Sequence, residues 1–216
     1  GVSSMLLPSD VLARPLSLMG IQPTDTLVVI PGGSIRDATV VGLGLERLGH
    51  ANWAILQGGF AKWSAETRPL DAALPGIEPS DYPVSAGPDA FTLDYQAVRG
   101  RVGDQSIVIV DTRPAINFRG EESDEPRAGH IPGAVNRPFK EDLDESGQIK
   151  PEADLAAAYA ALIPAKETPV VVHCRTGHQA SQTFFILTRL LGYQDVKWYD
   201  GSWTEWSARQ ELPVEK

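Results

Sequence analysis

The chain has 216 residues, of which 42% are hydrophobic and 22% are charged, and this composition is typical of a globular protein with a buried core. The formal net charge of -9 argues against binding to a nucleic-acid backbone, because proteins that do so are usually basic. No apolar run approaches the roughly 18 residues of a membrane span, and the single cysteine, Cys174, excludes an internal disulfide and a multi-cysteine metal site. We therefore expect no nucleic-acid partner, no membrane association and no cofactor.

Short apolar runs alternate with helical stretches, which predicts an α/β fold with parallel sheets flanked by helices. Apolar runs bounded by turn residues predict strands, in chain order, at residues 27–30, 53–56, 107–110, 170–173 and 196–199. Two helices are expected to end at residues 48–49 and 191–192, the second of them beginning about six residues after Cys174. Further helices are expected near 93–99 and 152–162, and short helices with aromatic residues after 58–59 and 201–202. Residues 111–139 are predicted to be irregular.

Two parts of the chain repeat one pattern. Residues 31–65 align without a gap on residues 174–208, so that the Leu-Gly pair at 48–49 falls on the Leu-Gly pair at 191–192. Each of these glycines is placed to end a helix in the left-handed conformation. The repeat predicts two domains of the same fold, at residues 1–70 and 93–216, joined by a proline-rich, acidic linker at residues 71–92.

The first domain has only 30 residues before the position that corresponds to Cys174, too few for all the strands of the second. We expect it to be incomplete in this chain and to be completed by an upstream segment, since a parallel sheet without those pieces would expose apolar edges. A genuine half-domain is the alternative. The first ten residues lack a basic region followed by a long apolar one, so we expect a cytoplasmic location. The periplasm is the alternative, because the chain does not begin with Met.

Cys174 ends a predicted buried strand and is followed by a short polar loop and a helix. Ligands of open parallel sheets bind at the carboxyl ends of the strands. Gly177 gives the loop the freedom to turn several backbone N–H groups toward one sulfur, and the helix N-terminus and Arg175 add positive charge. These features predict a lowered thiol pKa and a nucleophilic thiolate, since a decrease of two units corresponds to about 2.7 kcal/mol. The alternative is an inert cysteine buried in the core.

Three motifs, in this order along the chain, resemble the signatures of the rhodanese sulfurtransferase family. The first comprises Asp111-Thr112-Arg113, Phe118-Arg119-Gly120 and Gly129-His130-Ile131-Pro132-Gly133-Ala134-Val135-Asn136. The second, His173-Cys174-Arg175-Thr176-Gly177-His178-Gln179, resembles the active loop of that family, and the third, Tyr199-Asp200-Gly201-Ser202-Trp203-Thr204-Glu205-Trp206, resembles the C-terminal signature of its tandem-domain members. The resemblance implies two rhodanese-like domains, of which the first is inactive and carries Pro31 where the second has Cys174.

The resemblance also implies a double-displacement reaction. Cys174 takes the outer sulfur of a small anionic donor, becomes a persulfide, and gives the sulfur to cyanide or a cellular thiol. Arg175 stands where the thiosulfate-using branch has arginine, so thiosulfate is the expected donor. The loop lacks the lysine of that branch and has Thr176 in its place, which leaves 3-mercaptopyruvate as an alternative donor. A carrier that delivers the persulfide sulfur only to a partner protein is a further alternative.

The expected donor-binding residues are those of the loop and two arginines of the first motif, namely Arg175, Thr176, Gly177, His178, Gln179, Arg119 and Arg113. Together the three arginines are expected to form a positive funnel for anions. For Arg119 an ion pair with Glu121, Glu122 or Asp111 is an equal alternative, and for His178 a solvated position at the rim is favoured.

Structural roles are expected for several neighbouring residues. We expect Asp111 to brace the loop or the arginines, His130 to form a structural hydrogen bond, and Trp203 and Trp206 to be core or interface residues. The acidic run at residues 121–125 is expected to be a solvated loop, with docking of a basic partner as the alternative.

Two other cysteine-dependent reactions fit the sequence poorly. Cysteine phosphatases place an arginine six positions after the nucleophile to clamp the phosphoryl group, and here that position is Ala180. A papain-like hydrolase needs a histidine held against the cysteine as a base, whereas His173 is the adjacent residue of a strand and points to the opposite side.

Overall fold

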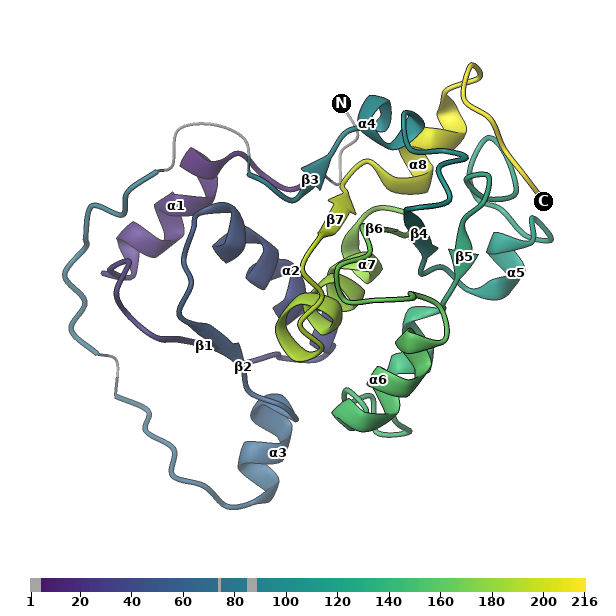
Figure 1. The fold of residues 1–216 in the computed structure, drawn as a ribbon. Helices are drawn as coiled ribbons and strands as arrows, with labels where there is room; N and C mark the ends of the chain where they lie inside the picture. Colours follow the sequence, from purple (N-terminus) through teal and green to yellow (C-terminus); the bar gives the residue numbers. More distant parts are fainter. Residues whose placement is uncertain (1–4, 74, 85–88) are drawn as a thin grey trace. The chain divides into compact units, whose positions relative to one another are not determined.

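The computed structural model describes residues 5–73, 75–84 and 89–216, which form two compact units, Leu6–Asp89 and Ala90–Lys216, the latter joined by Met5 (Figure 1). Residues 1–4, 74 and 85–88 lie outside the described ranges, and with them part of the N-terminal segment and parts of the predicted linker. In the described ranges no helix has the length and apolar character that crossing a membrane requires.

The second unit is built on a parallel five-stranded sheet in the order β3-β7-β6-β4-β5. Its strands are β3 (Thr92–Leu93), β4 (Val108–Asp111), β5 (Val135–Asn136), β6 (Val170–His173) and β7 (Val196–Tyr199). The register aligns Val170 of β6 with Val108 of β4 and Val196 of β7. All four residues of β6 are buried, as expected for a central strand covered on both faces.

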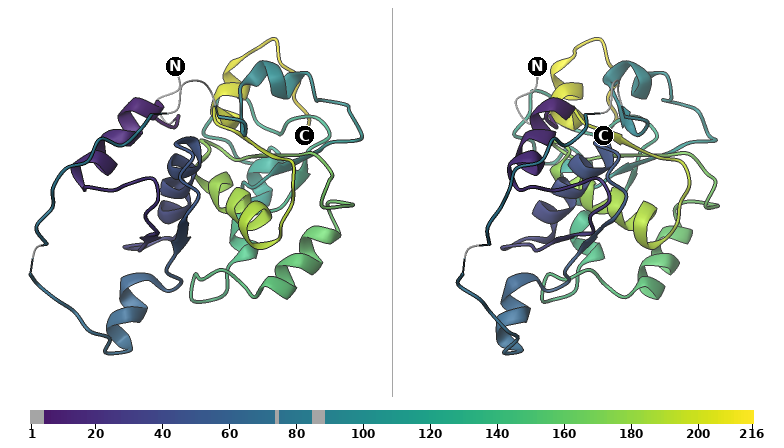
Figure 2. Two further views of the ribbon diagram at one scale, coloured as in Figure 1. Left: turned by 60° about the vertical axis from the view of Figure 1, so that its left-hand side comes forward. Right: turned by 90° about the vertical axis from the view of Figure 1, so that its left-hand side faces the viewer.

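Helices cover both faces of this sheet (Figures 1 and 2). They are α4 (Tyr95–Arg99), α5 (Ala115–Phe118), the 3-10 helix η1 (Phe139–Asp142), α6 (Glu152–Ala160), α7 (His178–Phe185), its π-helical continuation η2 (Ile186–Leu190) and α8 (Ser202–Ala208). Alternate strand residues Ile109, Val171 and Tyr199 share one core with Val98 of α4 and Trp203 of α8. Helix α7 packs on β6 and β7. Because successive side chains of a strand point to opposite faces of the sheet, these residues form a core on one face, while α7 covers the other face.

The first unit contains α1 (Ser9–Leu18), β1 (Leu27–Val29), α2 (Ile35–Arg47), β2 (Trp53–Ile55) and α3 (Gly59–Ala65). Strands β1 and β2 pair in parallel, so the series β1-α2-β2-α3 has the same order as β6-α7-β7-α8. Gly49 and Gly192 follow α2 and η2 with φ values of 72° and 68°. This confirms the predicted repeat and the left-handed glycine at the end of each helix.

Part of the predicted linker packs on the first unit, whereas its last residue, Thr92, begins strand β3 of the second unit. Tyr82 is buried in its core, where its hydroxyl lies 2.8 Å from Nδ1 of His50, and the backbone N–H of Ser80 donates to the carbonyl of Ser17. The boundaries 1–70, 71–92 and 93–216 stay predictions.

The two-stranded sheet of the first unit exposes apolar side chains. Val28, in β1, and Ile30, just after it, are 56% and 53% exposed. Such exposure is the feature expected of a sheet that lacks neighbours. The expectation that an upstream segment completes this domain is not confirmed and stays a prediction.

Candidate active site

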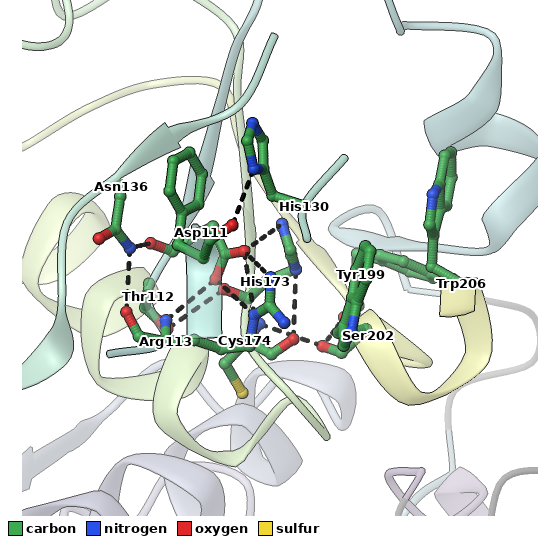
Figure 3. Close-up of polar contacts among 12 residues, drawn as sticks. Asp111, Thr112, Arg113, His130, Asn136, His173, Cys174, Tyr199, Ser202 and Trp206 are labelled. Atoms are coloured by element: carbon green, nitrogen blue, oxygen red, sulfur yellow. Dashed lines mark hydrogen bonds and ion pairs between the residues drawn. The ribbon is translucent and has the colours of Figure 1, made fainter. Parts of the chain in front are cut away.

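Cys174 directly follows the central strand β6 and lies at the carboxyl end of the sheet. Its backbone N–H faces the Ser202 hydroxyl at 3.3 Å, and its carbonyl accepts from the N–H of Trp203. The Ser202 hydroxyl in turn donates to the Tyr199 carbonyl. Strand β7 and the start of α8 therefore fix the backbone of the cysteine, while its sulfur points away from the polar cluster around Asp111 and His173 (Figure 3).

The loop after Cys174 curls around the sulfur. The N–H of Gly177 donates to Sγ at 3.1 Å, and the N–H groups of Thr176, Gln179 and Ala180 also form hydrogen bonds to it. Gly177 has a φ of 87°, a conformation that L side chains rarely adopt. A Cβ there would also lie 2.6 Å from the Trp198 ring. The structure thus confirms the predicted cup of amides and shows why this position is glycine.

The predicted lowering of the thiol pKa is wrong for this structure. Burial of Cys174 raises the pKa of its thiol, because removal from water disfavours the charged form. The hydrogen bonds from the loop amides lower the pKa but are outweighed. Burial therefore favours the neutral thiol, and the amides favour the anion that forms when the proton leaves.

Arg175 lies on the outer side of the loop and pairs with the acidic run. Its Nε donates to Oε1 of Glu125 at 2.8 Å, and its Nη1 lies 3.8 Å from Oδ2 of Asp124. The hydrogen bond and charge of Glu125 raise the pKa of the guanidinium, which stays charged. Glu125 is only 10% exposed, so the expectation that the whole run is solvated is wrong at this residue.

A buried polar cluster lies behind the cysteine. The Arg113 guanidinium forms two hydrogen bonds to Oδ2 of Asp111, at 3.0 Å from Nε and 2.5 Å from Nη2, and stacks on the Trp203 ring at 4.4 Å. His173 is also buried, with Nδ1 3.2 Å from the Cys174 carbonyl. Burial lowers the pKa of His173, so this ring is neutral near neutral pH. The bracing role expected for Asp111 is confirmed.

The remaining residues singled out in the sequence are spread over the same unit. Arg119 is exposed and pairs with Glu121 at 2.5 Å, the alternative that the sequence left open. His130 forms a hydrogen bond with the Phe118 carbonyl and stacks on the Phe118 ring, which confirms its structural role. Trp203 and Trp206 are buried in the core, as expected.

His178 and Gln179, the first residues of α7, are half-buried. No hydrogen-bond partner reaches the buried Oε1 of Gln179 within the described part of the chain.

The structure brings together the loop residues but not a funnel of free arginines. Arg113, Arg119 and Arg175 each pair with a carboxylate, of Asp111, Glu121 and Glu125 respectively. Their role in donor binding stays a prediction. Sequence reasoning missed three residues that hold the loop, Ser202, Thr204 and Glu125; the C-terminal motif contains the first two but does not indicate their contacts.

The profile of the rhodanese-like domain family matches residues 94–209, which are more than half of the chain. The chain belongs to the rhodanese-like domain family. It is 33% identical to a protein of Corynebacterium glutamicum named thiosulfate sulfurtransferase, over 97% of this chain and 72% of that protein. It is 36% identical to the sulfur carrier protein TtuD of Thermus thermophilus, over 78% of this chain and 63% of that protein.

Solved structures show the same fold for this rhodanese-like chain. The crystal structure of YnjE superposes with a TM-score of 0.83 at 24% identity, over 98% of this chain and 54% of that one. The wild-type structure of EanB gives a TM-score of 0.81 at 19% identity, over 99% of this chain and 55% of that one. The chain thus spans about half the length of these two proteins and 63% of the length of TtuD.

Proposed function

We propose that this rhodanese-like chain is a sulfurtransferase in which Cys174 carries the sulfur as a persulfide. The observation that carries the proposal is the single cysteine at the end of β6, with its sulfur enclosed by backbone N–H groups from the following loop. Such a cup favours an anionic sulfur in the way that an oxyanion hole favours an anionic oxygen.

The proposed reaction has two displacements. The Cys174 thiolate, formed by loss of its proton to solvent, attacks the outer sulfur of thiosulfate; a new S–S bond forms, and the original one breaks with sulfite as the leaving group. Cyanide or a cellular thiol then attacks the outer sulfur of the persulfide and releases the Cys174 thiolate. The loop residues Arg175–Gln179 are proposed to bind the donor.

Thiosulfate is the proposed donor, and the Corynebacterium glutamicum relative named thiosulfate sulfurtransferase supports it. The relative named sulfur carrier protein supports a second candidate, in which the persulfide sulfur passes only to a partner protein. The two candidates share the first displacement and differ in the second.

Intact-mass measurement after incubation with thiosulfate tests the shared step. We expect a gain of one sulfur atom that cyanide removes and that Cys174→Ser does not show. If neither thiosulfate nor 3-mercaptopyruvate adds sulfur to the native chain, the proposed function is wrong. Steady-state production of thiocyanate separates the candidates, because a carrier forms the adduct without rapid turnover.

A further inference from the structure

The mostly buried carboxylate of Glu125 contacts Arg175, the residue next to the proposed nucleophile. The side chain of Glu125 is 10% exposed, whereas that of Arg175 is 54% exposed. Oε1 of Glu125 accepts from Nε of Arg175 at 2.8 Å and from the Thr204 hydroxyl at 2.7 Å. This carboxylate is therefore part of the built structure, unlike Asp124, whose side chain is 83% exposed.

Thr204 ties this pair to the cysteine loop. Its backbone N–H donates to the Arg175 carbonyl at 2.9 Å, and its hydroxyl lies 3.0 Å from the same oxygen. Arg175 is thus held through both its backbone and its side chain by groups on one short helix and one acidic segment. The guanidinium has a fixed position beside the Cys174 loop, and its charge is matched there by Glu125.

We infer that Glu125 is a specificity-determining residue, which fixes Arg175 beside the cysteine loop and screens its charge against doubly charged sulfur donors. The inference rests on the proposed function, since it assumes that donors approach Cys174 past Arg175. A carboxylate in contact with a guanidinium cancels most of its field at longer range, so an anion gains less from Arg175 than from an unscreened arginine. The loss of binding free energy grows with the negative charge of the donor.

Glu125→Gln removes the charge and keeps an oxygen that accepts from Arg175 and Thr204. Placed in a Cys174→Ser background, where no sulfur transfer takes place, it allows equilibrium binding to be measured by calorimetry. Thiosulfate carries two negative charges and 3-mercaptopyruvate carries one. At low ionic strength we expect the substitution to tighten thiosulfate binding about tenfold and 3-mercaptopyruvate binding about threefold, with both gains shrinking in about 1 M salt.

Glu122→Gln is the matched control, because Glu122 belongs to the same acidic run and is exposed. We expect it to change either dissociation constant less than about twofold. If Glu125→Gln folds poorly, Asp124→Asn tests the same idea: its carboxylate lies 3.8 Å from Arg175, and a smaller gain of the same sign is expected.

The inference is overturned if thiosulfate binding to the Glu125→Gln protein is unchanged, weaker or undetectable, or if both donors gain equally. These outcomes differ from failure of the proposed function, which is read from the mass of the Cys174 protein. A chain that gains sulfur but shows no effect at Glu125 keeps its function and loses this inference.

Discussion

Replacing Gly177 by alanine tests whether the conformation of the loop is what directs its amide N–H groups at the sulfur of Cys174. The residue has a φ of 87°, which costs an L residue about 1–2 kcal/mol. The added Cβ would lie 2.6 Å from Cζ2 of Trp198 and 3.2 Å from the Asp200 carbonyl. Trp198 is buried, and its Nε1 donates to the Gly177 carbonyl at 3.0 Å, so the ring cannot move without straining that bond.

Overpacking of this kind costs about 1–3 kcal/mol beyond the backbone strain. We therefore expect Gly177→Ala to lower the free energy of unfolding by about 2–5 kcal/mol. Gly192→Ala is the control, since Gly192 has a φ of 68° but no atom within 4 Å of its added Cβ, and about 1–2 kcal/mol is expected there.

Urea unfolding of both variants measures the two free energies, and mass measurement after incubation with thiosulfate reports adduct formation. We expect Gly177→Ala to form the adduct much more slowly than Gly192→Ala, because its N–H no longer points at the sulfur. Equal free-energy losses for the two variants, within about 0.5 kcal/mol, would refute the steric argument.

Three further predictions concern the same unit. The Arg127 guanidinium donates to four carbonyls, those of Trp206, Ser207, Arg209 and Leu212. We therefore expect Arg127→Met to lower the free energy of unfolding in urea by about 3 kcal/mol. A decrease below about 1 kcal/mol would contradict this role. Because burial raises the pKa of Cys174, its alkylation by iodoacetamide is expected to be still accelerating at about pH 9, and a plateau below about pH 8 would show a lowered pKa instead. The folded chain keeps this proton longer than the unfolded one, so the free energy of unfolding is expected to fall as pH rises through the ordinary thiol pKa.

The central strands were predictable because burial on both faces leaves a continuous apolar run. β6 and β7 span the predicted residues 170–173 and 196–199. By contrast, β3 and β5 have two residues each and are defined by pairing with β7 and β4, for which a sequence has no local signal. The repeat was visible because each copy ends its helix with a left-handed glycine.

In the site, local chemistry was predictable and tertiary pairing was not. Cys174 and Gly177 stand out because a cysteine that ends an apolar run and a glycine in the polar loop after it are both visible in the local sequence. Glu125 pairs with Arg175 across fifty positions, and nothing in the acidic run distinguishes it from its exposed neighbours. The prediction of the thiol pKa was wrong for the same reason, since complete burial of the sulfur depends on what the fold packs around it.

Complete enclosure of the Cys174 side chain affects the timing of any reaction there. For the proposed sulfur transfer, a donor can reach the enclosed sulfur only if the loop moves, and that movement would set an upper limit on the rate of each step. The same burial is expected to slow attack by peroxide and so to protect the thiol from irreversible oxidation to the sulfinic acid. Burial of the cysteine is thus expected to lower the rate of the proposed transfer and to make the thiol more resistant to oxidation.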